Sequence, residues 1–209
     1  MLDDTNFSMK QSIVTLDLEG VLVPEIWIAV AEKTGISELR RTTRDEPDFD
    51  KLMRDRLAIL DRHDLKLSDI QQVVTTLRPL DGAKEFLDGL RSMVQVIILS
   101  DTFEQFAWPL LRQLSWPTLL CHRLEVVNDR IVGCNPCLSG QKREAVVALL
   151  RLNYYVIAAG DSFNDTAMLN EARVGFFFRA TDAVKRQFPR FQAVETYTDL
   201  MALIKQAMT

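Results

Sequence analysis

Three short runs of apolar residues, each closed by a polar residue, predict three buried strands. The runs cover residues 12–17, 94–100 and 154–161. They are shorter than typical helices and rich in β-branched residues, as strands covered on both faces usually are. They end in Asp17, Ser100 and Asp161. The polar segment before the first run predicts a flexible N-terminal tail over residues 1–11.

Helical spacing of apolar residues separates and follows these runs. It occurs at residues 86–90 and 145–150 and at the C-terminus, where Thr196 and Asp199 predict a capping box. Strands that alternate with helices indicate βαβ units, so the predicted fold class is α/β, a Rossmann-like parallel sheet with helices on both faces. In such sheets ligands bind beyond the carboxyl ends of the strands.

The segment from residue 24 to 78 is too long for one crossover helix and predicts a helical cap inserted after the first strand. A first helix ends at Gly35, a second covers residues 49–62, and Ser68 with Gln71 predicts a capping box for a third. Further along, residues 124–132 have the pattern of a hairpin. The predicted domains are a core of residues 12–23 and 79–209 and a cap of residues 24–78.

Arg56 lies within the apolar face of the second predicted cap helix. At about 100° per residue it projects between Leu52 and Leu60, whereas Lys51 and Arg54 project to the opposite side. An arginine on an inward face either extends along that face to reach solvent or is held by an anion. The helical pattern alone leaves both interpretations open.

Composition and charge exclude several classes of function. The 209 residues include 25 Lys and Arg against 29 Asp and Glu, a net charge of -4, so no general attraction to nucleic acid or to an anionic membrane is expected. No apolar run is long enough to span a membrane, and the first residues are too polar for a signal peptide. Three cysteines are too few for a disulfide framework, which favours a cytoplasmic protein.

Cys134 and Cys137 have the spacing of a redox pair or of half a zinc site. Zinc would need further ligands, and His63 and His122 are the only histidines in the chain. A redox pair would open a helix, with which Pro136 fits poorly. We therefore interpret the pair as a coincidence of loop sequence.

Acidic residues gather where the predicted strands end. Asp17 and Glu19 follow the first strand, and two adjacent carboxylates need a shared proton or a cation. Asp161 ends the third strand at the same edge, and Asp165 lies where the next helix begins. Taken by itself, the pair Asp17 and Glu19 is also consistent with an acidic start of a loop. Asp165 by itself is also consistent with a helix cap. Together, convergent carboxylates predict a hard-cation site suited to Mg²⁺.

Groups that bind a phosphoryl oxygen lie at the same predicted edge. Ser100 offers a hydroxyl, Asp101 follows it, and Lys142 begins the helix before the third strand. Singly, Ser100 is consistent with a helix cap and Lys142 with a solvated charge. Together they indicate phosphoryl transfer to a carboxylate. A phosphorylatable signalling receiver uses similar groups, but it carries an acidic pair well upstream of its phosphoacceptor, whereas only a tail precedes Asp17.

These residues, in this order, resemble the four motifs of the haloacid dehalogenase superfamily of phosphatases: Asp17-x-Glu19, Ser100, Lys142 and Gly-Asp-Ser-Phe-Asn-Asp at residues 160–165. The resemblance implies that Asp17 is the nucleophile, which becomes an aspartyl-phosphate, and that Glu19 is the general acid and later the base.

The same resemblance implies a magnesium shell and phosphate ligands. Mg²⁺ would be held by Asp17, the backbone carbonyl of Glu19 and Asp161, with Asp165 supporting that shell. Ser100 and Lys142 match the phosphate ligands, and Asn164 lies beside the same site.

The predicted cap resembles that of phosphoserine phosphatases. Glu25 and Arg56 match the residues that hold the amino and carboxylate groups of phosphoserine, and this implication favours the anion-holding interpretation of Arg56. Phe49 matches an aromatic residue that helps to exclude water.

Two departures from ordinary phosphoserine phosphatases narrow the resemblance. Glu19 stands where those enzymes carry Asp, and Ser100-Asp101-Thr102 stands where they carry Ser-Gly-Gly. With the run Leu-Glu-Gly-Val-Leu-Val-Pro-Glu at residues 18–25, these changes resemble a bifunctional subgroup that also transfers the phosphoryl group to homoserine. We expect a magnesium-dependent phosphoserine phosphatase with homoserine as a second acceptor. A phosphatase for another small phosphomonoester and a receiver domain are the alternatives, and a homodimer is compatible with the sequence.

Overall fold

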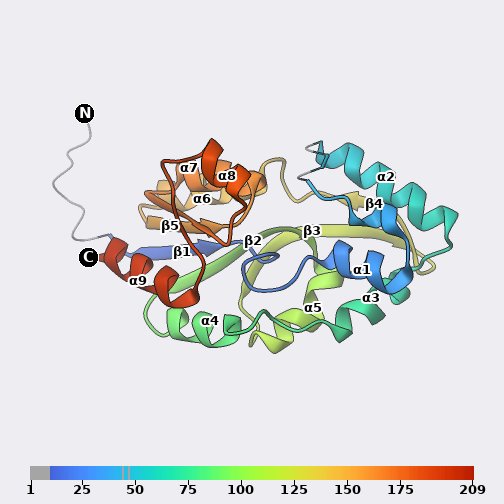
Figure 1. The fold of residues 1–209 in the computed structure, drawn as a ribbon, viewed down its shortest axis with the longest axis horizontal. Helices are drawn as coiled ribbons and strands as arrows, with labels where there is room; N and C mark the ends of the chain where they lie inside the picture. Colours follow the sequence, from blue (N-terminus) through green and yellow to red (C-terminus); the bar gives the residue numbers. More distant parts are fainter. Residues whose placement is uncertain (1–9, 44, 47) are drawn as a thin grey trace.

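A computed structural model describes residues 10–43, 45–46 and 48–209, which form a layered α/β fold (Figure 1). The strands of this described part make one seven-stranded sheet in the order β4-β3-β2-β1-β5-β6-β7. Neighbouring strands run parallel except for β3 and β4, which form an antiparallel hairpin. The predicted α/β fold class is confirmed. The strands are β1 Ser12–Leu16, β2 Gln95–Phe103, β3 Thr118–Val127, β4 Arg130–Asn135, β5 Tyr155–Gly160, β6 Val174–Phe178 and β7 Gln192–Val194.

Helices cover both faces of the sheet, α4, α5 and α9 on one and α6, α7 and α8 on the other (Figure 1). Side chains of β1 alternate between the two resulting cores, because Val14 and Leu16 join one hydrophobic cluster and Ile13 joins the other. Thr196 caps the last helix by accepting the N–H of Asp199, which confirms one half of the predicted capping box; the carboxylate of Asp199 accepts the hydroxyl of Thr196. These helices are α4 Ala83–Arg91, α5 Glu104–Gln113, α6 Gln141–Arg151, α7 Thr166–Glu171, α8 Asp182–Gln187 and α9 Tyr197–Met208.

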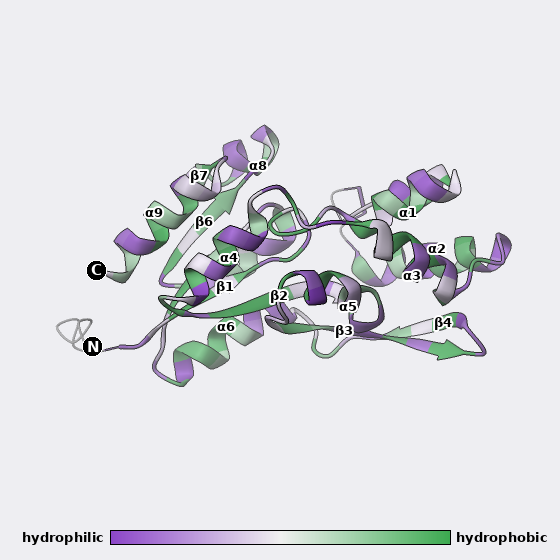
Figure 2. Ribbon diagram, turned by 90° about the horizontal axis from the view of Figure 1, so that it is seen from below, coloured by the Kyte–Doolittle hydropathy of each residue, from purple (hydrophilic) through white to green (hydrophobic). Residues whose placement is uncertain are grey.

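Three more helices lie together at one end of the molecule, beside the β3–β4 hairpin (Figure 2). Gly35 ends the first of them with a φ of 74°, and the second has the predicted bounds. The hairpin turns at Asn128 and Asp129, which both have positive φ, so the predicted hairpin is confirmed. A domain boundary between core and cap stays a prediction. These elements are α1 Ile26–Thr34, the 3₁₀ turn η2 Ser37–Arg40, α2 Phe49–Arg62 and α3 Leu67–Thr76.

The start of α3 differs from the sequence prediction. Its first turn is closed by Asp69, whose carboxylate accepts the N–H of Lys66 at 2.9 Å. Ser68 instead donates its hydroxyl to Asp129 of the hairpin turn at 2.6 Å, and Gln71 donates to a backbone carbonyl of α5. The predicted capping box of Ser68 and Gln71 is wrong because both side chains bind neighbouring elements.

Strand β2 continues beyond the predicted end at Ser100 and stops at Phe103. Its pairing with β3 is interrupted between Leu99 and Phe103, where the register shifts, and resumes opposite His122. Ser100 and Asp101 therefore lie in an irregular stretch of the strand. Such irregularities change the direction of side chains and are common beside active sites.

The predicted tail lies mostly outside the described residues, which begin at Lys10. The carbonyl of Gln11 accepts the N–H of Tyr155 at 3.0 Å, so the chain already pairs with β5 at that position. Among the helices that the structure describes, none combines the length and the hydropathy needed to cross a bilayer.

Candidate active site

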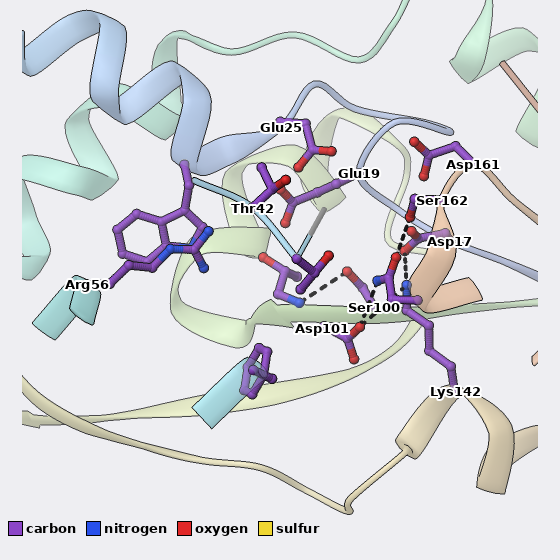
Figure 3. A pocket seen from close by; sticks show the side chains of 15 residues that line it. Asp17, Glu19, Glu25, Thr42, Arg56, Ser100, Asp101, Lys142, Asp161 and Ser162 are labelled. Atoms are coloured by element: carbon purple, nitrogen blue, oxygen red, sulfur yellow. Dashed lines mark hydrogen bonds and ion pairs between the residues drawn. The ribbon is translucent and has the colours of Figure 1, made fainter. Parts of the chain in front are cut away.

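The candidate active site lies at the carboxyl ends of the three central strands (Figure 3). Asp17 follows β1, Ser100 lies in β2, Asp161 follows β5, and Lys142 reaches the same place from the first turn of α6. All four residues are buried, with 2–4% of their surface exposed. The sequence predicted that these groups share one edge of the sheet, and in the structure they lie together at that edge.

Lys142 is the centre of an ion-pair network. Its Nζ lies 2.8 Å from Asp165, 3.0 Å from Asp17 and 3.7 Å from Asp101. Burial by itself would lower the pKa of Lys142, but the three carboxylates outweigh burial and raise that pKa well above its ordinary value. The lysine is therefore fixed in both position and charge.

Asp165 holds the loop after β5 as well as the lysine. One carboxylate oxygen accepts from Lys142, and the other accepts the N–H groups of Asp161 and Ser162 at 2.9 and 3.0 Å. A Cβ at Gly160 would lie 2.3 Å from the carboxyl carbon of Asp165, which explains the glycine before this loop. Asp165 is a structural centre of the site as well as part of the 3₁₀ turn η3 Phe163–Asp165.

The charges of this cluster favour a bound cation. Burial raises the pKa of Asp17 well above its ordinary value, and Asp165 and Asp161 raise it further, while Lys142 acts in the opposite direction. One ammonium group thus faces several carboxylates. A positive ion would relieve this repulsion, because it would stabilise the ionised form of Asp17.

The available ligand atoms suit a hard divalent cation. Oxygens of Asp17, Asp161 and Asp165 all lie within 4.8 Å of one another, and carboxylate oxygens are the usual ligands of such ions. Gly20 has a φ of 77°, and a Cβ there would lie 2.5 Å from a carboxylate oxygen of Asp161. The loop after β1 is therefore packed tightly against Asp161. Asp165 already accepts four hydrogen bonds, from Lys142, from the N–H of Asp161 and from the N–H and hydroxyl of Ser162, which suits it to support rather than to bind an ion.

Glu19 connects the sheet edge to the first cap helix. Its Oε2 accepts the N–H of Ile26, the first residue of α1, at 2.9 Å, and the hydroxyl of Thr102 also hydrogen-bonds to it. Burial raises the pKa of Glu19 from its ordinary value, although both hydrogen bonds oppose the shift. A carboxyl group with a raised pKa retains its proton closer to neutral pH, as a general acid must.

Arg56 lies at the other end of the same cavity and is 7% exposed. Its guanidinium lies 4.5 Å from the centre of the Trp27 ring and donates to the carbonyl of Arg41 at 2.8 Å. Burial lowers the pKa of Arg56 to about 10, and the charges of Glu19 and Glu25 act in the opposite direction. The guanidinium does not extend to solvent, so the solvent-reaching interpretation of this arginine is wrong.

Asp101 and Asn164 form the third side of the site. Asn164 donates to Asp101 at 3.0 Å and accepts the hydroxyl of Ser162. Burial raises the pKa of Asp101, but Lys142, His122 and Asn164 outweigh burial and lower it. Asp101 is therefore an ionised group in direct electrostatic contact with Lys142.

One cavity joins all the predicted site residues except Asp165 (Figure 3). Asp165 is fully buried and is not part of the cavity lining. Its remaining lining residues include Phe49, which the resemblance had matched to a water-excluding aromatic. The cavity is lined by Asp17, Glu19, Glu25, Trp27, Thr42, Thr43, Phe49, Arg56, Ser100, Asp101, Thr102, Lys142, Asp161, Ser162 and Asn164.

Residues 12–173 of the chain match the sequence pattern of the haloacid dehalogenase-like hydrolases. The chain belongs to this family. It is thus a hydrolase, and membership favours an enzyme over the phosphorylatable receiver that the sequence had left as an alternative.

The hydrolase is similar to named phosphatases. It is 61% identical over 189 residues to phosphoserine phosphatase ThrH of Pseudomonas aeruginosa, an alignment that covers 90% of this chain and 92% of that protein. It is 60% identical to a phosphoserine phosphatase of Pseudomonas syringae pv. tomato, over 90% of this chain and 80% of that protein. A solved phosphoserine phosphatase described as a phospho-aspartyl intermediate analogue shares the fold, with a TM-score of 0.76 and 20% identity over 94% of this chain and 99% of the other.

Sequence reasoning missed several residues of this hydrolase's site. Thr102 bonds to Glu19, Ser162 bonds to Asn164, and Trp27 packs against Arg56. Ser162 had a usable signal, since it lies within the motif that contains Asp161 and Asp165. Thr102 belongs to the Ser100-Asp101-Thr102 run that departs from the family pattern, but its bond to Glu19 depends on the irregular strand β2. Trp27 had no such signal, because its position depends on the packing of α1.

The cysteines lie outside the cavity and are free. Cys134 is in β4 rather than in a loop, which corrects the predicted placement, and Cys137 follows the strand. The thiol of Cys137 contacts the carbonyl of Cys121 at 2.9 Å, and burial raises the pKa of Cys121 to about 12. The thiol of Cys121 is therefore kept protonated and unreactive.

Proposed function

We propose that this hydrolase is a phosphoserine phosphatase, which releases phosphate from O-phospho-L-serine through an aspartyl-phosphate on Asp17. One observation carries the proposal: the cavity combines the cluster around Asp17 and Lys142 with the oppositely charged pair Glu25 and Arg56. Phosphoserine has a phosphate at one end and an ammonium and a carboxylate at the other. The names of the two relatives that are 60–61% identical support the same substrate.

At the phosphoryl end, Asp17 is the nucleophile. A carboxylate oxygen of Asp17 forms the new bond to phosphorus while the bond to the serine oxygen breaks, and Glu19 gives that oxygen its proton. Lys142 and the hydroxyl of Ser100 hold the oxygens of the phosphoryl group. Glu19 then takes a proton from water, which attacks phosphorus, releases phosphate and restores Asp17.

Magnesium is the cation that we propose for the acidic cluster, bound by Asp17, the backbone carbonyl of Glu19 and Asp161. When bound, it would neutralise negative charge on Asp17 and on the phosphoryl oxygens. Asp165 supports this shell by fixing Lys142 and the N–H groups of the loop after β5.

At the amino-acid end, Arg56 binds the substrate carboxylate. A planar guanidinium makes two parallel hydrogen bonds to a carboxylate, and the guanidinium of Arg56 lies over the Trp27 ring, 4.5 Å from its centre. Glu25 at the start of α1 binds the ammonium group. Phe49 covers the cavity from the start of α2 and excludes water.

The deciding experiment measures phosphate release from O-phospho-L-serine with Mg²⁺ and again with a chelator. We expect release only with Mg²⁺, and no release in Asp17→Asn, which keeps the size of the side chain and removes the nucleophile. Absence of release from wild-type protein under both conditions would refute the proposal. A panel of other small phosphomonoesters would then reveal a different substrate.

A second acceptor, homoserine, is proposed for the same intermediate. Glu19 and Asp101 depart from the ordinary pattern, and Glu19 is placed to take a proton from an alcohol as well as from water. In that step the homoserine hydroxyl attacks phosphorus, its proton goes to Glu19, and Asp17 is released. O-phosphohomoserine should form when homoserine is added with phosphoserine; free phosphate alone would rule out transfer. The cytoplasmic location and the homodimer stay predictions, the latter testable by light scattering.

A further inference from the structure

His122 is a buried polar residue of β3 that the proposed mechanism does not use, and it is 5% exposed. Its Nδ1 accepts the backbone N–H of Cys137 at 3.2 Å. Only a neutral imidazole accepts at that nitrogen, and its single proton is then on Nε2. Nε2 lies 3.5 Å from Oδ1 of Asp101, so the ring is oriented to donate to this carboxylate.

Asp101 connects this histidine to the groups that hold phosphate. Its other oxygen, Oδ2, accepts from Asn164 at 3.0 Å and lies 3.7 Å from Nζ of Lys142. The backbone of Asp101 lies where the pairing of β2 with β3 is interrupted, so the regular ladder does not fix this segment. Asn164 and Lys142 hold one oxygen of this side chain, and the bond from His122 constrains the other.

The histidine ring is itself held in place. Phe49 of α2 meets it edge-on with the ring centres 5.6 Å apart, and Phe103 lies on another side at 6.4 Å. With the bond from Cys137, these contacts restrict the orientation of the ring. The orientation of Asp101 therefore depends on β3, on α2 and on the chain that follows β4.

We propose that His122 is a positioning residue for phosphoryl transfer: it fixes Asp101, which in turn directs Lys142 and Asn164 at the phosphoryl group. This inference rests on the proposed function for its substrate. It assigns His122 no contact with substrate.

Three substitutions separate the two hydrogen bonds of the ring. His122→Gln keeps an N–H near the position of Nε2, His122→Asn keeps an acceptor for Cys137 but does not reach Asp101, and His122→Phe keeps the ring packing and removes both bonds. We expect His122→Gln to retain turnover within about threefold. We expect His122→Asn and His122→Phe to lose about tenfold in kcat with little change in KM, because each loses one hydrogen bond to the charged carboxylate of Asp101.

The other histidine provides the matched control. His63 is exposed at the end of α2, and His63→Gln and His63→Phe should leave kcat unchanged. Equal turnover in wild type and His122→Asn, or a loss in His122→Gln as large as in His122→Phe, would overturn the positioning role. A rise in KM without a fall in kcat would overturn it too, because that result indicates a pocket-shaping role. Circular dichroism of each variant identifies misfolded protein.

Each variant is assayed with O-phospho-L-serine and with p-nitrophenyl phosphate, which lacks the amino-acid end. If wild-type protein hydrolyses only p-nitrophenyl phosphate, the proposed substrate fails, and the pattern among the His122 variants on that compound still decides the inference. If both compounds are hydrolysed and the pattern is absent, the inference alone fails.

Discussion

Glu19→Gln tests whether Glu19 donates a proton in the first step of the proposed mechanism and accepts one in the second. The substitution keeps the side-chain length, and the amide oxygen can still accept the N–H of Ile26 that Glu19 accepts at 2.9 Å. We therefore expect the free energy of unfolding to change by less than about 1 kcal/mol. Turnover of phosphoserine should fall by roughly 10² to 10⁴-fold, the usual contribution of a positioned acid or base.

The leaving group distinguishes the two steps. A serine alkoxide needs a proton to depart, whereas nitrophenolate departs without one, so only the second step of p-nitrophenyl phosphate hydrolysis depends on Glu19. In stopped-flow absorbance, Glu19→Gln should release one nitrophenolate per active site in a burst and then turn over slowly. Rapid-quench experiments with phosphoserine should give no burst.

Glu25→Gln is the matched control, because it changes another carboxyl group that lines the same cavity. It should raise KM for phosphoserine. With p-nitrophenyl phosphate it should release nitrophenolate at a steady rate, without an initial burst. If Glu19→Gln slows the two substrates equally and shows no burst, Glu19 is not the proton donor of the first step.

Three further predictions concern other parts of the site. Gly20→Ala should lower the free energy of unfolding by about 2 kcal/mol and weaken Mg²⁺ binding by calorimetry, because it strains a positive φ and pushes a Cβ towards Asp161; unchanged values would contradict the tight packing. Arg56→Lys should raise KM for phosphoserine about tenfold with kcat retained, because the lysine would make one charge-assisted hydrogen bond fewer to the substrate carboxylate. An unaltered KM would argue against carboxylate binding. Asp17 and Glu19 have raised pKa values in the folded state, so their contribution to stability is full below the pKa of an unfolded carboxyl and is lost as the pH rises through the folded pKa. Urea denaturation of metal-free protein should therefore show stability falling from about pH 4 towards neutral and recovering with saturating Mg²⁺; a rise over this range would refute the assigned shifts.

The acidic end of the site was predictable because its residues directly follow strands that can be recognised in the sequence. Asp17 and Asp161 each close an apolar run, and parallel strands bring such ends to one edge. The inward position of Arg56 was predictable by a different route, since its projection onto the apolar face of a helix needs only the helical period, whereas its anion-holding role was implied by the family resemblance. Both arguments use local sequence and one general rule of sheet topology.

The remaining features depend on contacts between distant segments. His122 reaches the site because β2 resumes its pairing with β3 after an irregular stretch, and nothing in the apolar pattern marks that irregularity. Ser68 has a sequence suited to a helix cap, but α3 already begins at Leu67, and the hydroxyl of Ser68 donates to Asp129 of the hairpin turn, 61 residues along the chain. Side chains with both local and distant partners are where sequence reasoning fails in this protein.

The hydrogen bond from Ile26 to Glu19 has a consequence for how the cavity opens. Ile26 is the first residue of α1, so a displacement of α1 from the sheet would break one of the two hydrogen bonds that hold Glu19, the proposed acid, and leave the one from Thr102. In the proposed mechanism, a position of α1 further from the sheet would leave Asp17 and Lys142 in place but take one hydrogen bond from the proton donor. The alignment of the proposed acid is thus tied to the position of the first cap helix.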